Sequence, residues 1–327
     1  MRAVVLNEHG GPEVLTIREV PDPIPVPGEV LVDVVSTSCN RADLLQRMGL
    51  YPGPPMEHEI PGLEFAGHVV ALGEGVTRWA VGDAVMTITA GGGYAEQAVV
   101  HENQAVRVPE GVSLDEAGGL PEVFITAWDA LVLQGGLAEG GTALVHAGAS
   151  GVGTAAIQLC RMLDVEVIVT TSAGKLNRCL ALGAAAAVDY RSDDWGARVA
   201  ERTGGRGVDV VLDVVGGDYL DRNLDCLATG GTIVQVGVMG GGQATFGLAK
   251  LLFKRASVVG TTLRARSLTE KVAVSRAFEQ RVVPAFEDGR LVVVVDSRFA
   301  LDEVVEAHAH METNTSVGKI LLGVRPA

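Results

Sequence analysis

The sequence predicts an α/β protein in which a doubly wound, six-stranded parallel sheet is combined with a second, β-rich domain. The run Thr142–Leu163 contains a short apolar strand, a turn with three glycines, and a helix that has neither Gly nor Pro beyond Thr154. Strand-like and helix-like segments then alternate as far as Thr262, the pattern of parallel strands joined by helical crossovers. Residues 1 to 120 contain short β-rich segments separated by Pro- and Gly-rich turns.

The β-rich part is expected to contain one short helix at Asn40–Arg47. Ser113, with Glu116 three residues later, predicts a capping box that starts a second helix running past Leu120. The expected strands are Ala3–Leu6, Leu15–Val20, Glu29–Ser36, Gly67–Leu72, Ala84–Ile88, Tyr94–Val100 and Ala105–Val108.

The alternating part continues from the glycine turn with strands and helices in turn, and the last 60-odd residues return to mixed content. We therefore expect one domain at 122–263, and a second at 1–121 that residues 264–327 complete, with a ligand in the cleft between them. The expected elements are Glu166–Thr171, Leu176–Leu182, Ala187–Tyr190, Trp195–Thr203, Val208–Val214, Tyr219–Leu227, Thr232–Val238, Phe246–Lys254, Ser257–Thr262, a helix near Ala273–Glu287 and a strand Lys319–Val324.

Composition excludes several classes of protein. A net charge of −14 disfavours nucleic acid and anionic membranes as partners. No apolar run approaches the roughly 20 residues of a membrane-spanning helix, and the N-terminus resembles a first strand rather than a signal peptide. Four scattered cysteines fit a reduced, cytoplasmic protein.

The glycine turn indicates a dinucleotide site. Gly148, Gly151 and Gly153 would let the backbone approach a pyrophosphate at the start of a helix, whose free N–H groups favour anions. The residue that selects NAD or NADP should follow the next strand, and Ser172 and Lys175 stand there without a carboxylate. These two side chains can bind a 2′-phosphate, which favours NADPH; alternatively, Ser172 caps a helix and Lys175 is a solvated residue of its first turn.

The chain resembles the medium-chain dehydrogenase/reductases, and among them the zinc-free NADPH:quinone oxidoreductases of the zeta-crystallin type. The similarity extends over essentially the whole chain, and it implies a GroES-like catalytic domain joined to a Rossmann domain. The stretches that carry the resemblance are Asn40–Tyr51, Pro61–Gly67, Pro121–Trp128, His146–Gln158, Leu251–Arg255 and Val317–Leu321.

Comparison with zinc members of this superfamily predicts that no metal is bound. Zinc members have Cys where this chain has Asn40, three residues before Asp43, and His where it has Leu63. Loss of both leaves at best a lone carboxylate, Glu64, whereas zinc prefers nitrogen and sulfur ligands. Without a Lewis acid an alkoxide is poorly stabilised, so reduction of a quinone or activated enone is the favoured chemistry.

The resemblance also implies positions for the cofactor-binding residues. Ser150, Gly151 and Val152 would line the pyrophosphate turn, Thr126 would face the nicotinamide carboxamide, and Tyr190 would flank the adenine. The residues expected to bracket the nicotinamide are Val238, Met239, Thr262 and Leu263, and Asn314 is a further candidate. Packing remains the alternative role for Tyr190 and Met239.

Asn40 and Tyr51 are the candidate active-site residues. Their polar groups could bind the oxygens of the acceptor or orient the nicotinamide, and Tyr51 could donate a proton. Alternatively, Asn40 caps the following helix and Tyr51 is a turn residue before Pro52. His146 is expected to be structural.

The predicted function is NADPH-dependent reduction of a quinone by direct hydride transfer, without zinc. The alternatives are an enoyl reductase acting on an enone or enoyl thioester, a non-catalytic NADPH-binding protein of crystallin or RNA-binding type, and a zinc alcohol dehydrogenase. The acidic net charge disfavours RNA binding and Leu63 disfavours the zinc enzyme. The resemblance further implies a homodimer formed through the sheet-edge strand Ser257–Thr262.

Overall fold

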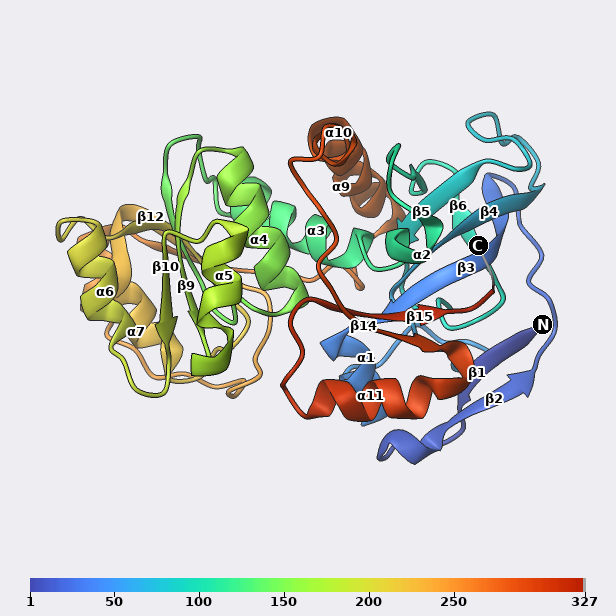
Figure 1. Cartoon of the computed structure of the whole chain (residues 1–327), viewed down its shortest axis with the longest axis horizontal. Helices are drawn as coiled ribbons and strands as arrows, with labels where there is room; N and C mark the ends of the chain where they lie inside the picture. Colours follow the sequence, from blue (N-terminus) through green and yellow to red (C-terminus); the bar gives the residue numbers. More distant parts are fainter. Residues whose placement is uncertain (326–327) are drawn as a thin grey trace. The chain divides into compact units, whose positions relative to one another are not determined.

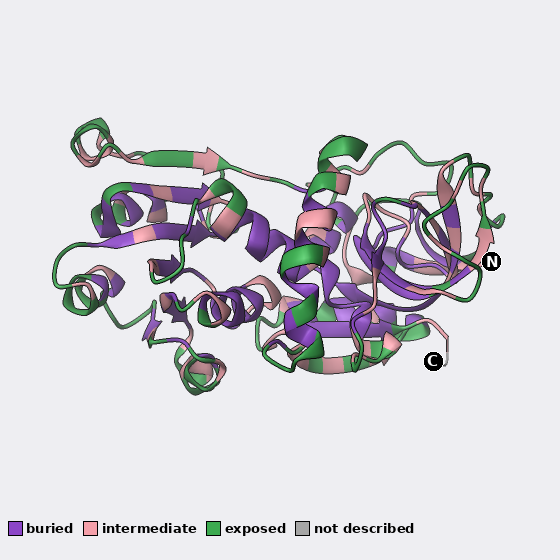
Figure 2. Cartoon of the chain, turned by 90° about the horizontal axis from the view of Figure 1, so that it is seen from above, coloured by how far each residue is buried: buried purple, intermediate pink, exposed green. Residues whose placement is uncertain are grey.

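The computed structural model describes residues 1–325, which form two compact units (Figure 1). The first unit contains Met1–Ile125 and the chain from Leu263 onward, and the second contains Thr126–Thr262. Helix α3 (Pro121–Trp128) carries the chain from the first unit into the second. Figure 2 shows buried residues in both the strands and the helices of each unit. In the described chain no helix is long and apolar enough to cross a membrane.

The second unit is built on a six-stranded, all-parallel sheet, as predicted. Its strand order is β10-β9-β8-β11-β12-β13, so the chain first moves outward from β8 and then returns to the other side of it at β11. In such a sheet, ligands bind beyond the carboxyl ends of the strands where the order reverses. The strands are β8 (Thr142–Val145), β9 (Glu166–Thr171), β10 (Ala186–Asp189), β11 (Val208–Asp213), β12 (Leu227–Gln235) and β13 (Ser257–Gly260).

Helical crossovers connect these strands. Helix α4 packs against β8 and β9 and contacts α5, and α7 contacts α6 and α8; α4 beside α5 and α6 beside α7 can be followed in Figure 1. Apolar side chains of the strands and of α6 and α7 form the core, including Leu144, Val199 and Leu224. The helices are α4 (Gly151–Met162), α5 (Leu176–Leu182), α6 (Trp195–Arg202), α7 (Tyr219–Cys226) and α8 (Leu248–Lys254).

The first unit is built on a seven-stranded sheet of order β14-β15-β3-β4-β5-β7, in which β6 also pairs with β3. All pairs are antiparallel except β14 with β15. The strands are β3 (Glu29–Cys39), β4 (Glu64–Leu72), β5 (Ala84–Ile88), β6 (Gln97–His101), β7 (Val106–Arg107), β14 (Val295–Ala300) and β15 (Lys319–Gly323); β1 (Arg2–Leu6) and β2 (Leu15–Glu19) form a separate hairpin.

The end of β3 is the part of this sheet that positions the candidate site. Its last six residues are all buried, and β15 pairs with them so that Ile320 lies opposite Cys39. Helix α1 begins directly after β3, so the polar residues at this junction lie beside the first residues of β15. The other helices of this unit are α1 (Arg41–Arg47), α2 (Leu114–Ala117), α9 (Leu268–Arg281), α10 (Val283–Glu287) and α11 (Val304–Glu312).

Three expectations about local structure are wrong. The Ser113 side chain makes no capping bond, and the helix it was expected to start, α2, ends at Ala117. The single helix expected near 273–287 is two helices, which meet at Val282, two residues before Pro284. Strand β14 and helix α11 were not predicted, although both belong to the first unit.

Candidate active site and cofactor site

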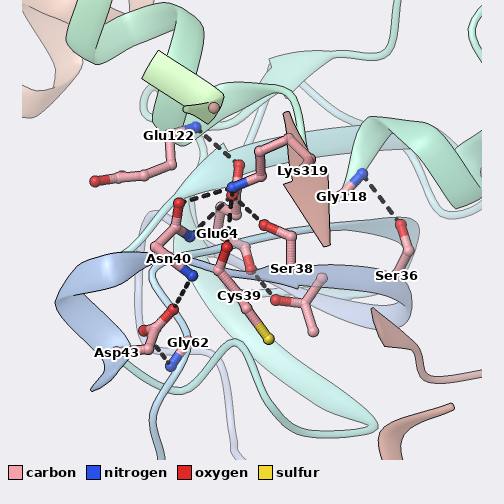
Figure 3. A network of polar contacts seen from close by, with 12 residues as sticks. Ser36, Ser38, Cys39, Asn40, Asp43, Gly62, Glu64, Gly118, Glu122 and Lys319 are labelled. Carbon is pink, nitrogen blue, oxygen red and sulfur yellow. Dashed lines mark hydrogen bonds and ion pairs between the residues drawn. The ribbon is translucent and has the colours of Figure 1, made fainter. Parts of the chain in front are cut away.

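A buried ion pair lies at the centre of the candidate site in the first unit (Figure 3). The Lys319 Nζ is 2.9 Å from Glu64 Oε1, and the side chains of these residues are 3% and 0% exposed. Lys319 also donates to Asn40 Oδ1 at 2.7 Å and to the Cys39 carbonyl at 3.3 Å. Three acceptors therefore surround the ammonium, as a buried lysine requires.

Glu64 holds four groups from different parts of the chain. Its Oε1 accepts from Ser38 Oγ, from Asn40 Nδ2 and from Lys319, and its Oε2 accepts from the Glu122 backbone N–H at 2.8 Å. The last bond satisfies an amide of the first turn of α3, which has no partner within the helix. Glu64 thus fixes the β3 end, the Asn40 side chain and the start of α3 together.

The Asn40 side chain does not cap α1. Its Oδ1 and Nδ2 bind Lys319 and Glu64, while its backbone N–H donates to Asp43 Oδ2 at 2.8 Å. One N–H of the amide group is uncommitted to these partners, because Nδ2 carries two protons. The ion pair therefore orients Asn40 rigidly.

Asp43 ties a second set of buried groups to Asn40. Its Oδ1 accepts from the Gly62 N–H, and its Oδ2 accepts from the Tyr94 hydroxyl at 3.2 Å as well as from Asn40. Burial raises the Asp43 pKa to about 6, although these hydrogen bonds and the charge of Lys319 oppose the rise. The Tyr94 hydroxyl also lies 3.2 Å from His308 Nε2, and burial lowers the pKa of that imidazole to about 3. His308 is therefore neutral at physiological pH.

Tyr51 lies in the loop after α1, where Arg264 holds its backbone. Arg264 donates from Nη1 to the Tyr51 carbonyl, from Nε to the Ala90 carbonyl and from Nη2 to Gln46 Oε1, at 2.7 to 2.9 Å. Its guanidinium also lies 5.1 Å from the centre of the Tyr51 ring. Burial, and then the charge of Glu122, raise the pKa of Tyr51. Tyr51 consequently holds its proton more tightly than an ordinary tyrosine does.

The residues around Asn40 do not fit a zinc ion. The Glu64 carboxylate already accepts four hydrogen bonds, and the Lys319 ammonium occupies the position of a cation beside it. Burial raises the pKa of the neighbouring Cys39 thiol to about 12, so it carries no thiolate for a metal. Within residues 1–325 no group of three or more His, Cys, Asp or Glu side chains is arranged to hold a metal ion.

The turn between β8 and α4 fits a dinucleotide pyrophosphate. A Cβ at Gly148 would lie 2.6 Å from the Cβ of Val169, and one at Gly153 would lie 2.3 Å from the Ala147 carbonyl oxygen, so both positions require glycine. Ser150 caps the helix by accepting from the Gly153 N–H at 3.0 Å. Among the described residues, the Gly151 and Val152 amides have no acceptor. Two free N–H groups at the start of a twelve-residue helix are suited to an anion.

The end of β9 carries no acidic side chain. Glu166, its only carboxylate, opens the strand and pairs with Arg202. Ser172 and Lys175 follow the strand, and Ser172 makes no capping bond with its side chain. Tyr190 lies next to this segment because its N–H donates to the Thr171 carbonyl at 3.2 Å. The structure therefore brings Ser172, Lys175 and Tyr190 to one edge of the second unit.

The remaining predicted cofactor residues lie as follows. Thr126 is buried in α3. Val238 and Met239 follow β12 and are 54% and 55% exposed. Thr262 is the last residue of the second unit and Leu263 the first of the returning chain. Asn314 belongs to the first unit, where its Oδ1 accepts from Arg41 at 2.6 Å.

His146 is a structural residue, as expected. Its Nδ1 lies 2.8 Å from Thr170 Oγ1 and its Nε2 lies 2.7 Å from Asn223 Oδ1, and it is fully buried. Asn223 in turn donates to Asp213 Oδ2. The network joins β8, β9, β11 and α7 beneath the glycine turn.

Four polar residues of the first unit went unrecognised as site residues in the sequence: Asp43, Glu122, Arg264 and Lys319. Lys319 carried a signal in the sequence, because it is a cation at the start of an apolar run. Glu122 carried one as well, because it follows a proline at the first position of a helix. Arg264 gave none, because its partners lie far away in the sequence, and Asp43 shows only a local pairing with Asn40, while its other partners, Gly62 and Tyr94, are distant.

Comparison with known proteins identifies the family. Residues 26–110 match the model of the alcohol dehydrogenase GroES-like domain, and residues 151–279 match that of the zinc-binding dehydrogenases. The human synaptic vesicle membrane protein VAT-1 homolog is 31% identical over 339 residues, covering 98% of this chain and 86% of the relative. The quinone oxidoreductase of Lama guanicoe is 30% identical over 326 residues, covering 98% and 97%.

Solved structures agree with this assignment. Escherichia coli quinone oxidoreductase complexed with NADPH superimposes with a TM-score of 0.89 at 29% identity, covering 99% of this chain and 100% of that one. The JamJ enoyl reductase gives the same TM-score at 24% identity, covering 99% of each chain, which shows a shared fold alone. The predicted fold class, a GroES-like domain with a Rossmann domain, is confirmed. The chain belongs to the medium-chain dehydrogenase/reductase superfamily.

Proposed function

We propose that this chain is an NADPH-dependent quinone reductase that works without zinc. The observation that carries the proposal is the Lys319–Glu64 ion pair, which places a fixed ammonium beside Asn40, while both oxygens of Glu64 are engaged by hydrogen bonds within the chain. An acceptor that is already electron-poor needs no Lewis acid in order to receive a hydride.

The second unit supplies the groups suited to the cofactor. The free amides of Gly151 and Val152 would bind the pyrophosphate, and Ser172 and Lys175 would bind the 2′-phosphate of NADPH. Two charge-assisted bonds of about 1.5–3 kcal/mol each would favour NADPH over NADH by a large factor. When bound, the reduced nicotinamide supplies a hydride.

The first unit supplies the groups suited to the acceptor. The uncommitted N–H of Asn40 can donate to an acceptor oxygen, and the Tyr51 hydroxyl can do the same without losing its proton. Both residues are held from behind, Asn40 by the ion pair and Tyr51 by Arg264. Fixed donors stabilise developing negative charge without reorganising, which is the main electrostatic contribution expected here.

The proposal is tested by following NADPH oxidation with an ortho-quinone, a para-quinone and an enoyl thioester under the same conditions. Quinone reduction with little enoyl turnover is expected. Turnover of the enoyl thioester alone would make the chain an enoyl reductase, and tight NADPH binding without turnover of any acceptor would make it a binding protein.

We also propose that the chain forms a homodimer through β13. This strand is at the edge of its sheet, and its Ser257, Val258 and Gly260 are exposed. An exposed edge is available for pairing with another strand. Light scattering should give twice the mass of one chain, and V258P should shift the protein toward monomer.

A further inference from the structure

The Glu122 side chain is a carboxyl group that takes no part in the proposed binding of the cofactor or the acceptor. Its backbone N–H is fixed by Glu64, but the side chain extends away from the Lys319–Glu64 pair (Figure 3). Among the described residues its carboxyl group has no hydrogen-bond partner, and the residue is only partly buried. With no partner in the described chain, this carboxyl group is available to water or to a bound ligand.

Five charged groups, from four helices or strands and one connecting segment, and the Tyr51 ring interact with Glu122. Two carboxylates oppose its ionisation and three cations favour it, while Tyr51 lies close enough for its own titration to be affected. The groups are Glu64 on β4, Asp43 on α1, Lys319 on β15, Arg264 in the segment after β13, Lys271 on α9 and Tyr51 in the loop after α1.

The balance of these influences keeps Glu122 protonated near neutral pH. Burial, followed by the charge of Glu64, raises its pKa to about 8, and the cations only partly oppose the rise. Lys319 is already paired with Glu64 and Arg264 with backbone carbonyls, so neither is committed to Glu122. A carboxylic acid whose pKa lies near the working pH is an effective proton donor.

We propose that Glu122 is the acid that protonates the reduced acceptor. The inference rests on the proposed function, because it needs an acceptor bound by Asn40 and Tyr51. Glu122 adjoins both of these residues: its backbone is joined through Glu64 to Asn40, and its carboxyl group is near Tyr51.

The other ionisable groups of the site are poorly suited to this role. The pKa of Tyr51 is raised above its ordinary value, and the Cys39 pKa of about 12 keeps that thiol protonated. Asp43 and Glu64 already accept hydrogen bonds on both oxygens. His308 is neutral and points its Nε2 at Tyr94.

The step is balanced for a quinone. The acceptor gains two electrons and one hydrogen as a hydride from the reduced cofactor, which leaves oxidised. The O–H bond of Glu122 breaks as a new O–H bond forms on the acceptor oxygen, giving a hydroquinone. Water then returns a proton to the Glu122 carboxylate.

Two measurements on the full-length protein test the proposal, using E122Q, E122D and the control E74Q, whose carboxylate is exposed in the same unit. The first needs no substrate: infrared difference titration should show a protonated carboxyl band that is lost in E122Q and that titrates near pH 8 in the wild type. A Glu122 that is already ionised at pH 6 would overturn the proposal.

The second measurement is the pH profile of kcat with NADPH and an ortho-quinone. E122Q should lower kcat by roughly 10²-fold, the usual contribution of a general acid, and should remove the fall in rate at high pH. E122D should recover part of the rate, E74Q should match the wild type, and NADPH affinity should be unchanged throughout. E122Q with wild-type kcat and an unaltered pH profile would refute only the role of Glu122, whereas a wild type that reduces no acceptor would refute the proposed function as well.

Discussion

Removal of the Lys319 ammonium should strongly destabilise the first unit. The variant K319M keeps an unbranched side chain of similar length but takes away the charge and all three hydrogen bonds, to Glu64, to Asn40 and to the Cys39 carbonyl. Glu64 would then be a fully buried carboxylate without its cation.

The expected cost follows from this burial. Removing one member of a buried ion pair typically costs about 3–5 kcal/mol, because the remaining charge is desolvated and uncompensated. In E64Q/K319M no charge is left behind, so we expect the double variant to regain about 1–3 kcal/mol relative to the sum of the single changes. K271M, which removes a part-exposed lysine with no ion pair among the described contacts, should cost about 0.5 kcal/mol or less.

Unfolding of the first unit can be followed separately. Trp79 lies in the first unit and Trp128 and Trp195 in the second, so a W128F/W195F background reports on the first unit through its fluorescence in urea. A signal from the first unit alone is needed because chains of several units depart from two-state unfolding. A K319M variant that loses no more stability than K271M would refute the view that the ion pair organises the site.

Three further predictions follow from the other sites. K175A should weaken NADPH binding by roughly 10-fold or more and leave NADH binding nearly unchanged, since only NADPH has the 2′-phosphate. Fluorescence titration measures both affinities, and equal losses for the two cofactors would contradict the role of Lys175 in binding the 2′-phosphate. G148A should lower both the melting temperature and NADPH affinity because its Cβ would lie 2.6 Å from Val169, whereas G174A, which has open space around it, should do neither. E122Q should gain stability relative to the wild type as the pH rises: with a pKa of about 8 against the ordinary 4.5, the folded wild type loses about 1.4 kcal/mol of unfolding free energy per pH unit between pH 4.5 and about 8, and glutamine removes that loss. Urea unfolding at pH 6 and pH 9 with the same difference between E122Q and wild type would contradict it.

The parallel sheet could be predicted because its signals are local. The strand, glycine turn and helix of the β8–α4 unit follow one another within about twenty residues, and each has its own composition. The absence of a carboxylate after β9 could likewise be read directly from the sequence. Such features depend little on the rest of the chain.

The elements that were missed depend on distant contacts. Strand β14 exists because it pairs with β15, about twenty residues further along, and its own residues are only partly buried or exposed. Helix α2 is short because a glycine pair follows it: a Cβ at Gly118 would lie 2.2 Å from Ser36 Oγ, and one at Gly119 would lie 2.4 Å from Leu321. The glycine pair is visible in the sequence, but the close packing against Ser36 and Leu321 that requires it is not, and neither is the pairing of β14 with β15.

The candidate site likewise combines residues that could be predicted from the sequence with residues whose contacts could not. Asn40 and Tyr51 could be selected by resemblance, but the partners that hold them are separated by hundreds of residues: Lys319 is 279 positions from Asn40, and Arg264 is 213 from Tyr51. The Lys319–Asn40 pair forms only when β15 lies beside β3. The Arg264–Tyr51 pair forms only when the segment after β13 contacts the loop after α1. The contacts of Lys319 and Arg264 with these residues therefore required the structure.

The most direct test of the account is NADPH-dependent quinone reduction by protein from which metal has been removed with a chelator. The rate should be unchanged by chelation and by added zinc if the Lys319 ammonium is the fixed cation beside Asn40. A rate that disappears on chelation and returns with stoichiometric zinc would contradict it.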